Sequence, residues 1–244
     1  MRIRGAVLEE IGRDRLYSTS KPITICELEL DPPGSGELLV RIEAAGICHS
    51  DLSVVNGSRV RPMPMLLGHE ASGIVEQLGD GIYDVAKGDR VSMTFLPRCG
   101  ECANCRTDGR LPCSVGSAAN NAGTLIDGGL RIHRDGETIM HHLGVSGFAT
   151  HAVVDRRSVV KVGSDVPPDI AAVLGCAVLT GGGALINSGK PILGDTIIVV
   201  GLGGVGVAAL ITALSLGYGD VIGVDALPEK LATATHLGAT AAYT

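Results

Sequence analysis

A glycine-rich turn between a strand and a helix constrains the fold of this chain more than any other feature. The apolar, β-branched run from Thr196 to Val200 leads into Gly201-Leu202-Gly203-Gly204-Val205-Gly206, which fits G-x-G-x-x-G, and then into a helix ending at about Leu216. A second strand, Val221–Val224, and a second helix, from about Pro228 to Leu237, follow. Strands alternating with crossover helices predict a parallel sheet, and glycines placed between the first strand and helix are typical of dinucleotide-binding domains.

The glycines and one acid define a predicted cofactor site. Gly201 would make the tight turn, Gly203 would admit a pyrophosphate at the helix N-terminus, and Gly206 would allow close helix–strand packing. Asp225 ends the next strand, where an acid accepts hydrogen bonds from the adenosine ribose and disfavours a 2′-phosphate. NAD is therefore favoured over NADP. A glycine-rich turn in a doubly wound protein without a nucleotide is the alternative.

Four of the seven cysteines form a compact run. Cys99, Cys102, Cys105 and Cys113 have the spacing C-x2-C-x2-C-x7-C. Four thiolates close in sequence can surround one tetrahedral zinc and leave no open position, which is a structural type of site. An iron–sulfur cluster is the alternative, but the ferredoxin run has a shorter last spacer and a following Pro, where this chain has Ser114. The stretch from Pro97 to about Gly129 has no periodicity, so we expect it to be irregular and held by this metal.

Composition limits the remaining classes. The chain has 244 residues, 45% hydrophobic and 19% charged, which fits one or two globular domains. Its net charge of −6 argues against a nucleic-acid partner. The N-terminal residues do not form a secretory signal, and the uncharged stretch from Thr196 to Gly219, although long enough to cross a bilayer, breaks on glycines. We expect a cytoplasmic protein with no membrane partner.

The part before the nucleotide motif has the pattern of a β-rich domain. Strands are predicted at Glu37–Ala44, Ala71–Leu78, around Val91, at Phe148–Val154 and at Ser158–Val162. Helical segments are predicted from Asp169 to Ile186, after Pro167-Pro168.

Three more residues could carry metal chemistry: Cys48, His69 and Cys176. Taken singly, each has an ordinary interpretation, such as a small core cysteine or a histidine in a turn. Their spacing does not show that they converge.

The motifs that contain these residues resemble one known family. Gly68-His69-Glu70-x-x-Gly73 with Gly79 and Ile82 is followed by the four-cysteine run, Gly175-Cys176 with Thr180, and the nucleotide glycines, and Cys48-x-x-Asp51 precedes them. In this order, over essentially the whole chain, they resemble the zinc-dependent alcohol dehydrogenases of the medium-chain dehydrogenase/reductase family.

The resemblance implies a fold of class α/β plus β. A GroES-like β-barrel catalytic domain at 1–175, with a structural-zinc lobe at about 97–115, would be followed at 176–244 by the first half of a Rossmann parallel-sheet domain. Family members continue further, so the C-terminal remainder would be missing. We expect the chain alone to bind NAD poorly and not to turn over.

The resemblance also assigns roles to single residues. Cys48, His69 and Cys176 would hold a catalytic zinc, giving two zinc ions per chain, with Asp51 orienting His69 and Glu70 lying near the metal. Ser50 would take the alcohol proton, and Phe95 would line the substrate pocket. The cofactor would contact Gly201, Gly203, Gly204, Val205, Gly206, Asp225, Lys230, His49 and Thr180.

The implied reaction is hydride transfer between an alcohol, primary or aromatic, and NAD, interconverting the alcohol with its aldehyde or ketone, in a homodimer or homotetramer. A glutathione-dependent formaldehyde dehydrogenase is an alternative, but Arg59 and Arg61 stand near the position of that branch's acidic residue. Reductases and quinone oxidoreductases of the same fold typically lack the zinc ligands. A non-catalytic zinc-binding fragment is the third alternative. Some relatives use a histidine at the position of Ser53 to pass the proton to solvent. The sequence of this chain therefore does not identify the group that would carry the proton to solvent.

Overall fold

The computed structural model describes every residue from Met1 to Thr244, and the chain divides into two compact units, Met1–Gly175 and Cys176–Thr244. The α-helices are α1 (Tyr17–Ser20), α2 (His49–Val55), α3 (Ser114–Ala122), α4 (Pro168–Val173), α5 (Leu179–Gly183), α6 (Gly204–Leu216) and α7 (Pro228–His236). The strands are β1 (Arg2–Leu8), β2 (Ile23–Leu30), β3 (Glu37–Gly46), β4 (Met65–Leu66), β5 (Glu70–Leu78), β6 (Arg90–Met93), β7 (Ile132–Arg134), β8 (Glu137–His141), β9 (His151–Asp155), β10 (Val159–Lys161), β11 (Ile197–Val200), β12 (Val221–Val224) and β13 (Ala241–Tyr243).

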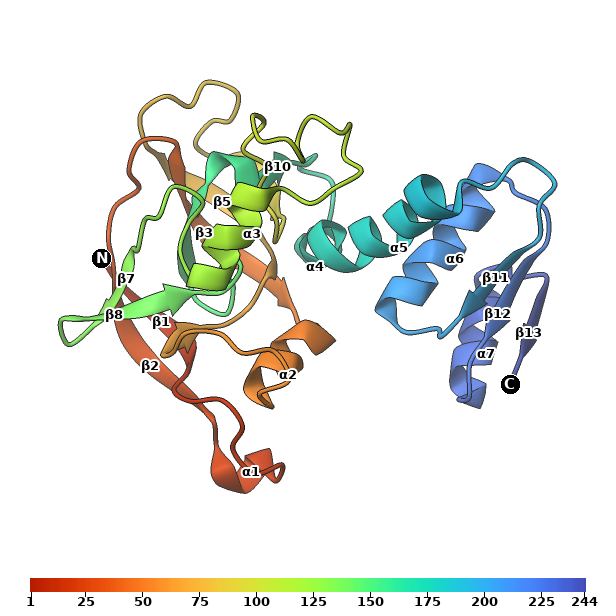
Figure 1. Ribbon diagram of the computed structural model, residues 1–244, viewed down its shortest axis with the longest axis horizontal. Coiled ribbons are helices and arrows are strands. Elements are labelled where there is room, and N and C mark those ends of the chain that lie inside the picture. Colours follow the sequence, from red (N-terminus) through yellow and green to blue (C-terminus); the bar gives the residue numbers. More distant parts are fainter. The chain divides into compact units, whose positions relative to one another are not determined.

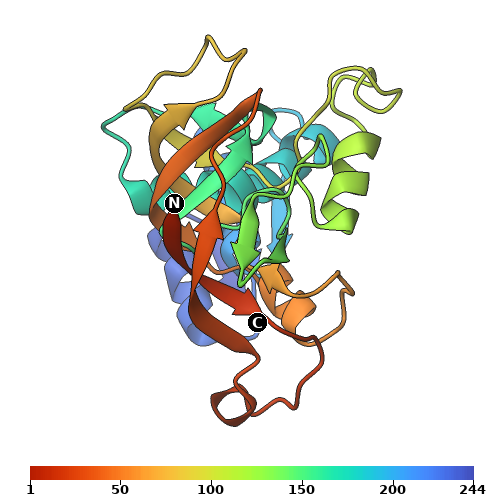
Figure 2. The same ribbon diagram turned by 90° about the vertical axis from the view of Figure 1, so that its left-hand side faces the viewer.

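The first unit contains a closed barrel in the order β1-β2-β7-β8-β4. Strands β1 and β2, red in Figure 2, run antiparallel with Ile3 opposite Leu28. The sequence analysis assigned none of these five strands. Strands β4 and β7 span only two and three residues and β2 is largely exposed, so they give little signal, whereas β1 alternates between exposed and buried side chains and was overlooked.

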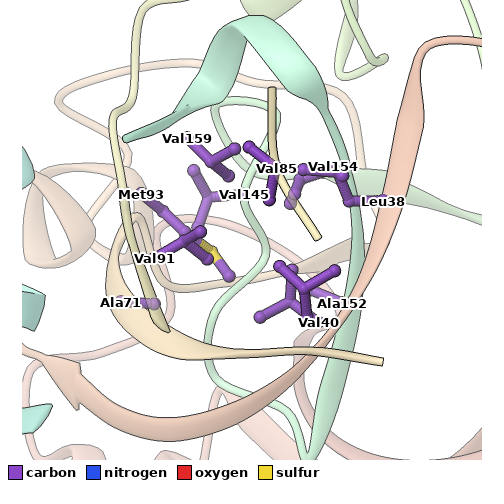
Figure 3. Packing of buried hydrophobic residues seen from close by; sticks show 11 residues of the cluster. Leu38, Val40, Ala71, Val85, Val91, Met93, Val145, Ala152, Val154 and Val159 are labelled. Carbon is purple, nitrogen blue, oxygen red and sulfur yellow. The ribbon is translucent and has the colours of Figure 1, made fainter. Parts of the chain in front are cut away.

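A five-stranded sheet in the order β10-β6-β5-β3-β9 completes the unit. These strands are the ones that the sequence predicted, within a few residues at each end. Their inward side chains form a core in which Val40 of β3 lies opposite Ala152 of β9, with Val91 and Met93 of β6 packed nearby (Figure 3). This sheet carries Cys48 just beyond the end of β3 and places His69 just before β5.

The second unit is a parallel sheet with crossover helices, as predicted. Its order is β11-β12-β13, with α6 connecting the first two strands and α7 the next two (Figure 1). Leu202, Leu210 and Ala213 form its core with residues of the strands. The strand–glycine–helix order therefore predicts the fold of the second unit correctly.

One predicted irregular stretch is partly helical. The sequence analysis expected no regular structure from Pro97 to about Gly129, but α3 lies within it. Its sequence, SVGSAANNA, places Val115, Ala118, Ala119 and Ala122 on one face, but the helix is short and three of these four residues are small, so the signal is weak. The helix is instead fixed at its ends, because the Cys113 sulfur accepts from the Gly116 N–H and Gly123 ends the helix in the left-handed conformation.

The apolar stretch from Thr196 to Gly219 divides into β11 and α6, as the glycines indicated. A different helical segment, Pro168–Gly189, is long enough to cross a membrane, with a mean hydropathy of 1.8 over its most apolar window. Length and composition alone carry this finding, and core helices meet the same criteria.

Candidate metal centre and cofactor loop

The centre of the first unit is an Asp51–His69 pair that is almost fully buried. Asp51 Oδ1 lies 3.0 Å from His69 Nδ1, and the two side chains are 5% and 1% exposed. An acid on Nδ1 requires a proton there, so Nε2 is the ring nitrogen that can bind a metal. Although burial alone would raise the pKa of Asp51, hydrogen bonding by His142 and His69 lowers it below its ordinary value. The carboxylate therefore stays ionised.

Cys48 lies at the start of α2 and is tied to the same acid. Its backbone N–H donates to Asp51 Oδ2 at 3.0 Å, and its sulfur accepts from the Ser50 N–H at 3.5 Å. The ligand atoms of Cys48, His69 and Glu70 lie within 4.8 Å of one another. A thiolate, an imidazole nitrogen and a carboxylate at this separation suit zinc.

Glu70 and Phe95 lie beside His69. A Cβ at Gly46 would overlap the Glu70 carboxylate and lie 3.2 Å from its Cβ, so Gly46 makes the space that Glu70 occupies. The rings of His69 and Phe95 meet edge-on, with their centroids 6.0 Å apart. Phe95 therefore forms one wall beside the His69 imidazole.

The four lobe cysteines are arranged around a common point. The sulfurs of Cys99 and Cys105 are 3.9 Å apart, as are those of Cys102 and Cys113. Ligands at 2.3 Å from one tetrahedral zinc would be about 3.8 Å apart, whereas a disulfide requires about 2.05 Å. Backbone N–H groups of Cys99, Cys102 and Cys105 each donate to a sulfur of the set, at 3.4 Å. The donor set therefore fits one closed zinc site.

The thiols of the lobe do not all ionise on their own. The hydroxyl of Ser114 and the backbone N–H of Cys105 bring the pKa of Cys102 down to about 5. Desolvation and the neighbouring thiols instead raise the pKa of Cys105 to about 11. A cation is required before all four can be thiolates, which is the state that a metal stabilises.

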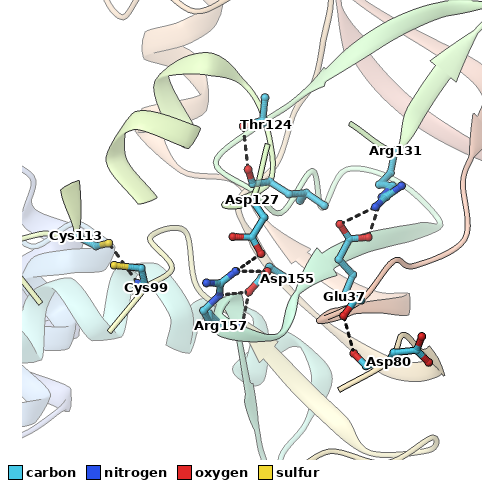
Figure 4. A network of polar contacts seen from close by, with 11 residues as sticks. Glu37, Asp80, Cys99, Cys113, Thr124, Asp127, Arg131, Asp155 and Arg157 are labelled. Carbon is cyan, nitrogen blue, oxygen red and sulfur yellow. Dashed lines mark hydrogen bonds and ion pairs between the residues drawn. The ribbon is translucent and has the colours of Figure 1, made fainter. Parts of the chain in front are cut away.

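A network of ion pairs lies beside the lobe (Figure 4). Arg157 donates to Asp155 through Nε at 2.7 Å and to Asp127 through Nη2 at 2.6 Å. Cys99, Asp127 and Arg157 line one surface pocket of about 450 Å³. The network ties the loop that follows α3 to the end of β9, beside the lobe.

In the second unit, the glycine turn has the geometry that the motif predicts. Gly201 has φ +91°, which only glycine adopts readily, and a Cβ at Gly206 would overlap the Gly201 carbonyl. A Cβ at Gly203 would meet no atom within 4 Å, so that position faces open space at the start of α6. Asp225 accepts from the Leu202 N–H at 2.7 Å and from the Leu227 N–H at 3.0 Å. These bonds lower its pKa and hold the carboxylate beside the turn.

The remaining predicted residues occupy their own elements. Ser50 and exposed His49 lie in α2, where His49 Nδ1 is 3.5 Å from the Ser53 hydroxyl. Gly204 and Val205 begin α6, Lys230 lies in α7, and Thr180 is an exposed residue of α5. Cys176 is buried and is the first residue of the second unit.

Comparison with known proteins decides the family. The model of the alcohol dehydrogenase GroES-like domain matches residues 34–164, more than half of the chain. The chain belongs to the zinc-dependent alcohol dehydrogenases of the medium-chain dehydrogenase/reductase family. The predicted fold class, a GroES-like barrel followed by a partial Rossmann-like sheet, is confirmed with it.

Solved structures of this family resemble the chain along its length. An alcohol dehydrogenase zinc-binding domain protein from Burkholderia ambifaria is 34% identical, with a TM-score of 0.90 over 99% of this chain and 64% of that one. Benzyl alcohol dehydrogenase from Acinetobacter calcoaceticus is 32% identical, with a TM-score of 0.87 over 100% and 64%. A cobalt- and zinc-bound thermostable alcohol dehydrogenase from Pyrobaculum aerophilum is 29% identical, with a TM-score of 0.79 over 100% and 66%. The chain thus spans less than two thirds of the length of these relatives.

Sequence reasoning missed two features of the first unit's centre. It gave neither His141 nor His142 a role, yet His142 contacts Asp51 at 3.3 Å. It also passed over Gly46, whose missing side chain admits Glu70. A buried polar contact between distant segments leaves no periodic signal, so only the pair of adjacent histidines in an apolar context could have drawn attention.

Proposed function

We propose that this chain carries the metal centre and the cofactor loop of an oxidoreductase that transfers a hydride between an alcohol and NAD. The observation that carries the proposal is the buried Asp51–His69 pair beside Cys48. A buried ionised acid on Nδ1 sets His69 to bind a metal through Nε2. Histidines that bind a metal almost always donate their other ring N–H to such a partner.

In this proposal, Cys48, His69 and Cys176 hold the catalytic zinc. Gly175 packs so closely on Met93 that a Cβ there would overlap the Met93 carbonyl, and Phe95 is two residues further along. Cys176 follows Gly175 directly, so its Cα lies about 3.8 Å from that of Gly175. These facts support Cys176 as the third ligand. Glu70 is a nearby acid of the same centre.

When bound, zinc supplies a Lewis acid for the alcohol oxygen, and NAD supplies the hydride acceptor. The chain's own residues position the reactants. Ser50 follows Cys48 by two residues and offers a hydroxyl for the alcohol proton. His49, with Ser53 3.5 Å from its Nδ1, is the neighbouring group that can face a pyrophosphate. Phe95 provides an apolar wall beside His69.

The cofactor part of the proposal depends on Asp225 and the turn. Gly203 leaves room for phosphates at the N-terminus of α6, where the backbone N–H groups point outward. The ionised Asp225 carboxylate favours a ribose 2′-hydroxyl and repels a 2′-phosphate, so NAD is proposed over NADP. Thr180, Val205 and Lys230 are proposed as further cofactor contacts.

The proposed substrates are primary or aromatic alcohols. Benzyl alcohol dehydrogenase, at 32% identity, supports this class. A glutathione adduct is less well supported, since Arg59 and Arg61 have no carboxylate partner within 4 Å and would repel the cationic amino group of glutathione. A cytoplasmic location and a homodimeric or homotetrameric assembly are proposed with the activity.

The test measures NADH formation from benzyl alcohol and from short primary alcohols, together with bound metal. The protein that contains this chain is compared with its Cys48→Ser variant. We expect alcohol-dependent NADH formation that the substitution abolishes, with loss of one metal ion. Metal binding without any alcohol-dependent NADH formation would favour the non-catalytic zinc-binding alternative.

A further inference from the structure

A second buried histidine contacts the acid of the metal centre. His142 is 1% exposed, and its Nδ1 lies 3.3 Å from Asp51 Oδ1, the oxygen that also contacts His69 Nδ1. The rings of His69 and His142 meet edge-on at 85°, with their centroids 5.2 Å apart. No hydrogen bond of good geometry reaches His142 Nδ1, and Asp51 Oδ1 at 3.3 Å is the acceptor that it contacts.

The backbone around His142 holds its ring in this place. The His142 N–H donates to the Ser146 hydroxyl at 3.0 Å, and the Val145 and Ser146 N–H groups donate to the His142 carbonyl at 3.1 and 3.2 Å. Leu143 and Ser146 both adopt positive φ, near +53° and +52°. A tight loop built at this cost fixes the ring direction.

The protonation of the group follows from its surroundings. The ring nitrogen of His142 that faces the acid is Nδ1, 3.3 Å from Asp51 Oδ1. An ionised Asp51 can only accept. The proton therefore belongs on Nδ1, where the contact with Asp51 lies. Three donors then face Asp51: Cys48 N–H bonds to Oδ2, His69 Nδ1 lies 3.0 Å from Oδ1, and His142 Nδ1 lies 3.3 Å from the same oxygen.

We propose that His142 is a positioning residue for the metal centre: as a second imidazole donor it locks the Asp51 carboxylate, and through it the orientation and tautomer of His69. The inference rests on the proposed metal binding by Cys48 and His69. Cys48 N–H and His69 already place one donor on each oxygen, and His142 adds a second donor on Oδ1, so rotation of the carboxylate would break three contacts in place of two. Loss of such an outer partner typically weakens metal binding by about 10- to 100-fold.

Three substitutions of His142 distinguish a role as hydrogen-bond donor to Asp51 from a role in packing alone. In His142→Asn, the amide nitrogen can occupy the place of Nδ1, the same number of bonds from Cα. In His142→Gln, the nitrogen reaches the place of Nε2 instead, and His142→Leu keeps volume without a donor. Zinc affinity is measured by competition with a chromophoric chelator, and the cobalt(II) spectrum of the site is recorded in parallel. The zinc affinity of the four-cysteine site, which His142 does not contact, is measured in the same protein as the reference value.

His141 provides the matched control. It is equally buried, and its Nε2 accepts from the Arg131 N–H at 3.1 Å, away from Asp51. His141→Gln can keep that acceptor, and we expect its metal centre to match that of the unsubstituted protein. We expect His142→Asn to retain affinity and cobalt spectrum, and His142→Gln and His142→Leu to lose about 10- to 100-fold in affinity with a shifted spectrum.

Equal loss in all three His142 variants would overturn the proposal in favour of packing, and so would no loss in any of them. If the variants do not fold, ¹⁵N–¹H spectra of the histidine rings in the unsubstituted protein decide instead. They must show a proton on Nδ1 of His142, and a proton on Nε2 alone overturns the inference. If the protein binds no Cys48-dependent metal, the proposed function fails, while the ring spectra still test the Asp51 contact.

Discussion

Alanine substitution at two glycines of one turn should affect two different properties, the stability of the second unit at Gly206 and NAD binding at Gly203. A Cβ at Gly206 would lie 2.9 Å from the Gly201 carbonyl carbon and closer still to its oxygen, and 3.5 Å from Val199 Cγ1. Real Cβ atoms essentially never approach within 3.0 Å of such atoms. The obstacle is backbone held by β11, so it cannot turn aside. Gly206→Ala should destabilise the second unit by about 3 kcal/mol or more, at the upper end for overpacking.

Gly203→Ala meets no such obstacle. Nothing lies within 4 Å of the added Cβ, and φ is −74°, which alanine adopts without strain. The entropic gain of about 0.4–1 kcal/mol is offset by the weaker N-cap preference of alanine, so stability should change by less than about 1 kcal/mol. The methyl group instead fills the space proposed for the pyrophosphate. NAD should bind at least about tenfold more weakly, or about 1.4 kcal/mol.

Hydrogen exchange of the β11–β13 amides reports the stability of the second unit by itself, and saturation-transfer NMR measures NAD binding even when it is weak. We expect Gly206→Ala to lose exchange protection and Gly203→Ala to keep it while losing NAD affinity. A Gly206→Ala protein as stable as the parent would refute the packing argument. Unchanged NAD binding by Gly203→Ala would refute the proposed phosphate position.

Cys105→Ser removes one of the four convergent sulfurs. The zinc content should therefore fall by one ion per chain, and proteolysis between Cys99 and Cys113 should become faster. An unchanged zinc content would argue against the closed site. Asp225→Ala removes both the acceptor for the ribose hydroxyl and a negative charge. In competition binding, the ratio of the affinities for NAD and NADP should therefore decrease. An unaltered ratio would contradict the proposed contact of Asp225 with the ribose. Burial lowers the pKa of His141 to about 3 from about 6.5 unfolded. Because the folded pKa is the lower one, stability is full above about pH 6.5 and falls as the pH drops toward 3, by at most about 1.4 kcal/mol per unit. Urea unfolding at several pH values should show a flatter slope for His141→Gln, and an equal slope would argue against a neutral His141.

The sequence predicted those parts of the fold whose residues carry a local rule. The parallel sheet follows from β-branched strands, glycines with special backbone angles and Ala/Leu-rich helices. Each of these signals lies within a short stretch of the sequence. The strands around Val40, Val75 and Val91 each contain a run of consecutive buried residues, and turn-forming residues precede the first and the last of them. The barrel strands β4 and β7 span two and three residues, too short for any period to appear.

The candidate site divides in the same way. Cys99 to Cys113 converge within one loop, so spacing alone predicts their cluster. The contact of Asp51 with His142 joins residues far apart in the chain, and it depends on the register of β8 and the loop after it. No pattern in one sequence encodes that distance, and the family resemblance supplied only the order of the motifs.

The most direct test of the account is the number of zinc ions bound per chain, measured by elemental analysis of metal-stripped and zinc-reconstituted protein. We expect two ions per chain, falling to one in Cys48→Ser and to one in Cys105→Ser. One ion in the parent protein, lost only in Cys105→Ser, would leave the lobe intact and contradict the metal centre at Cys48 and His69.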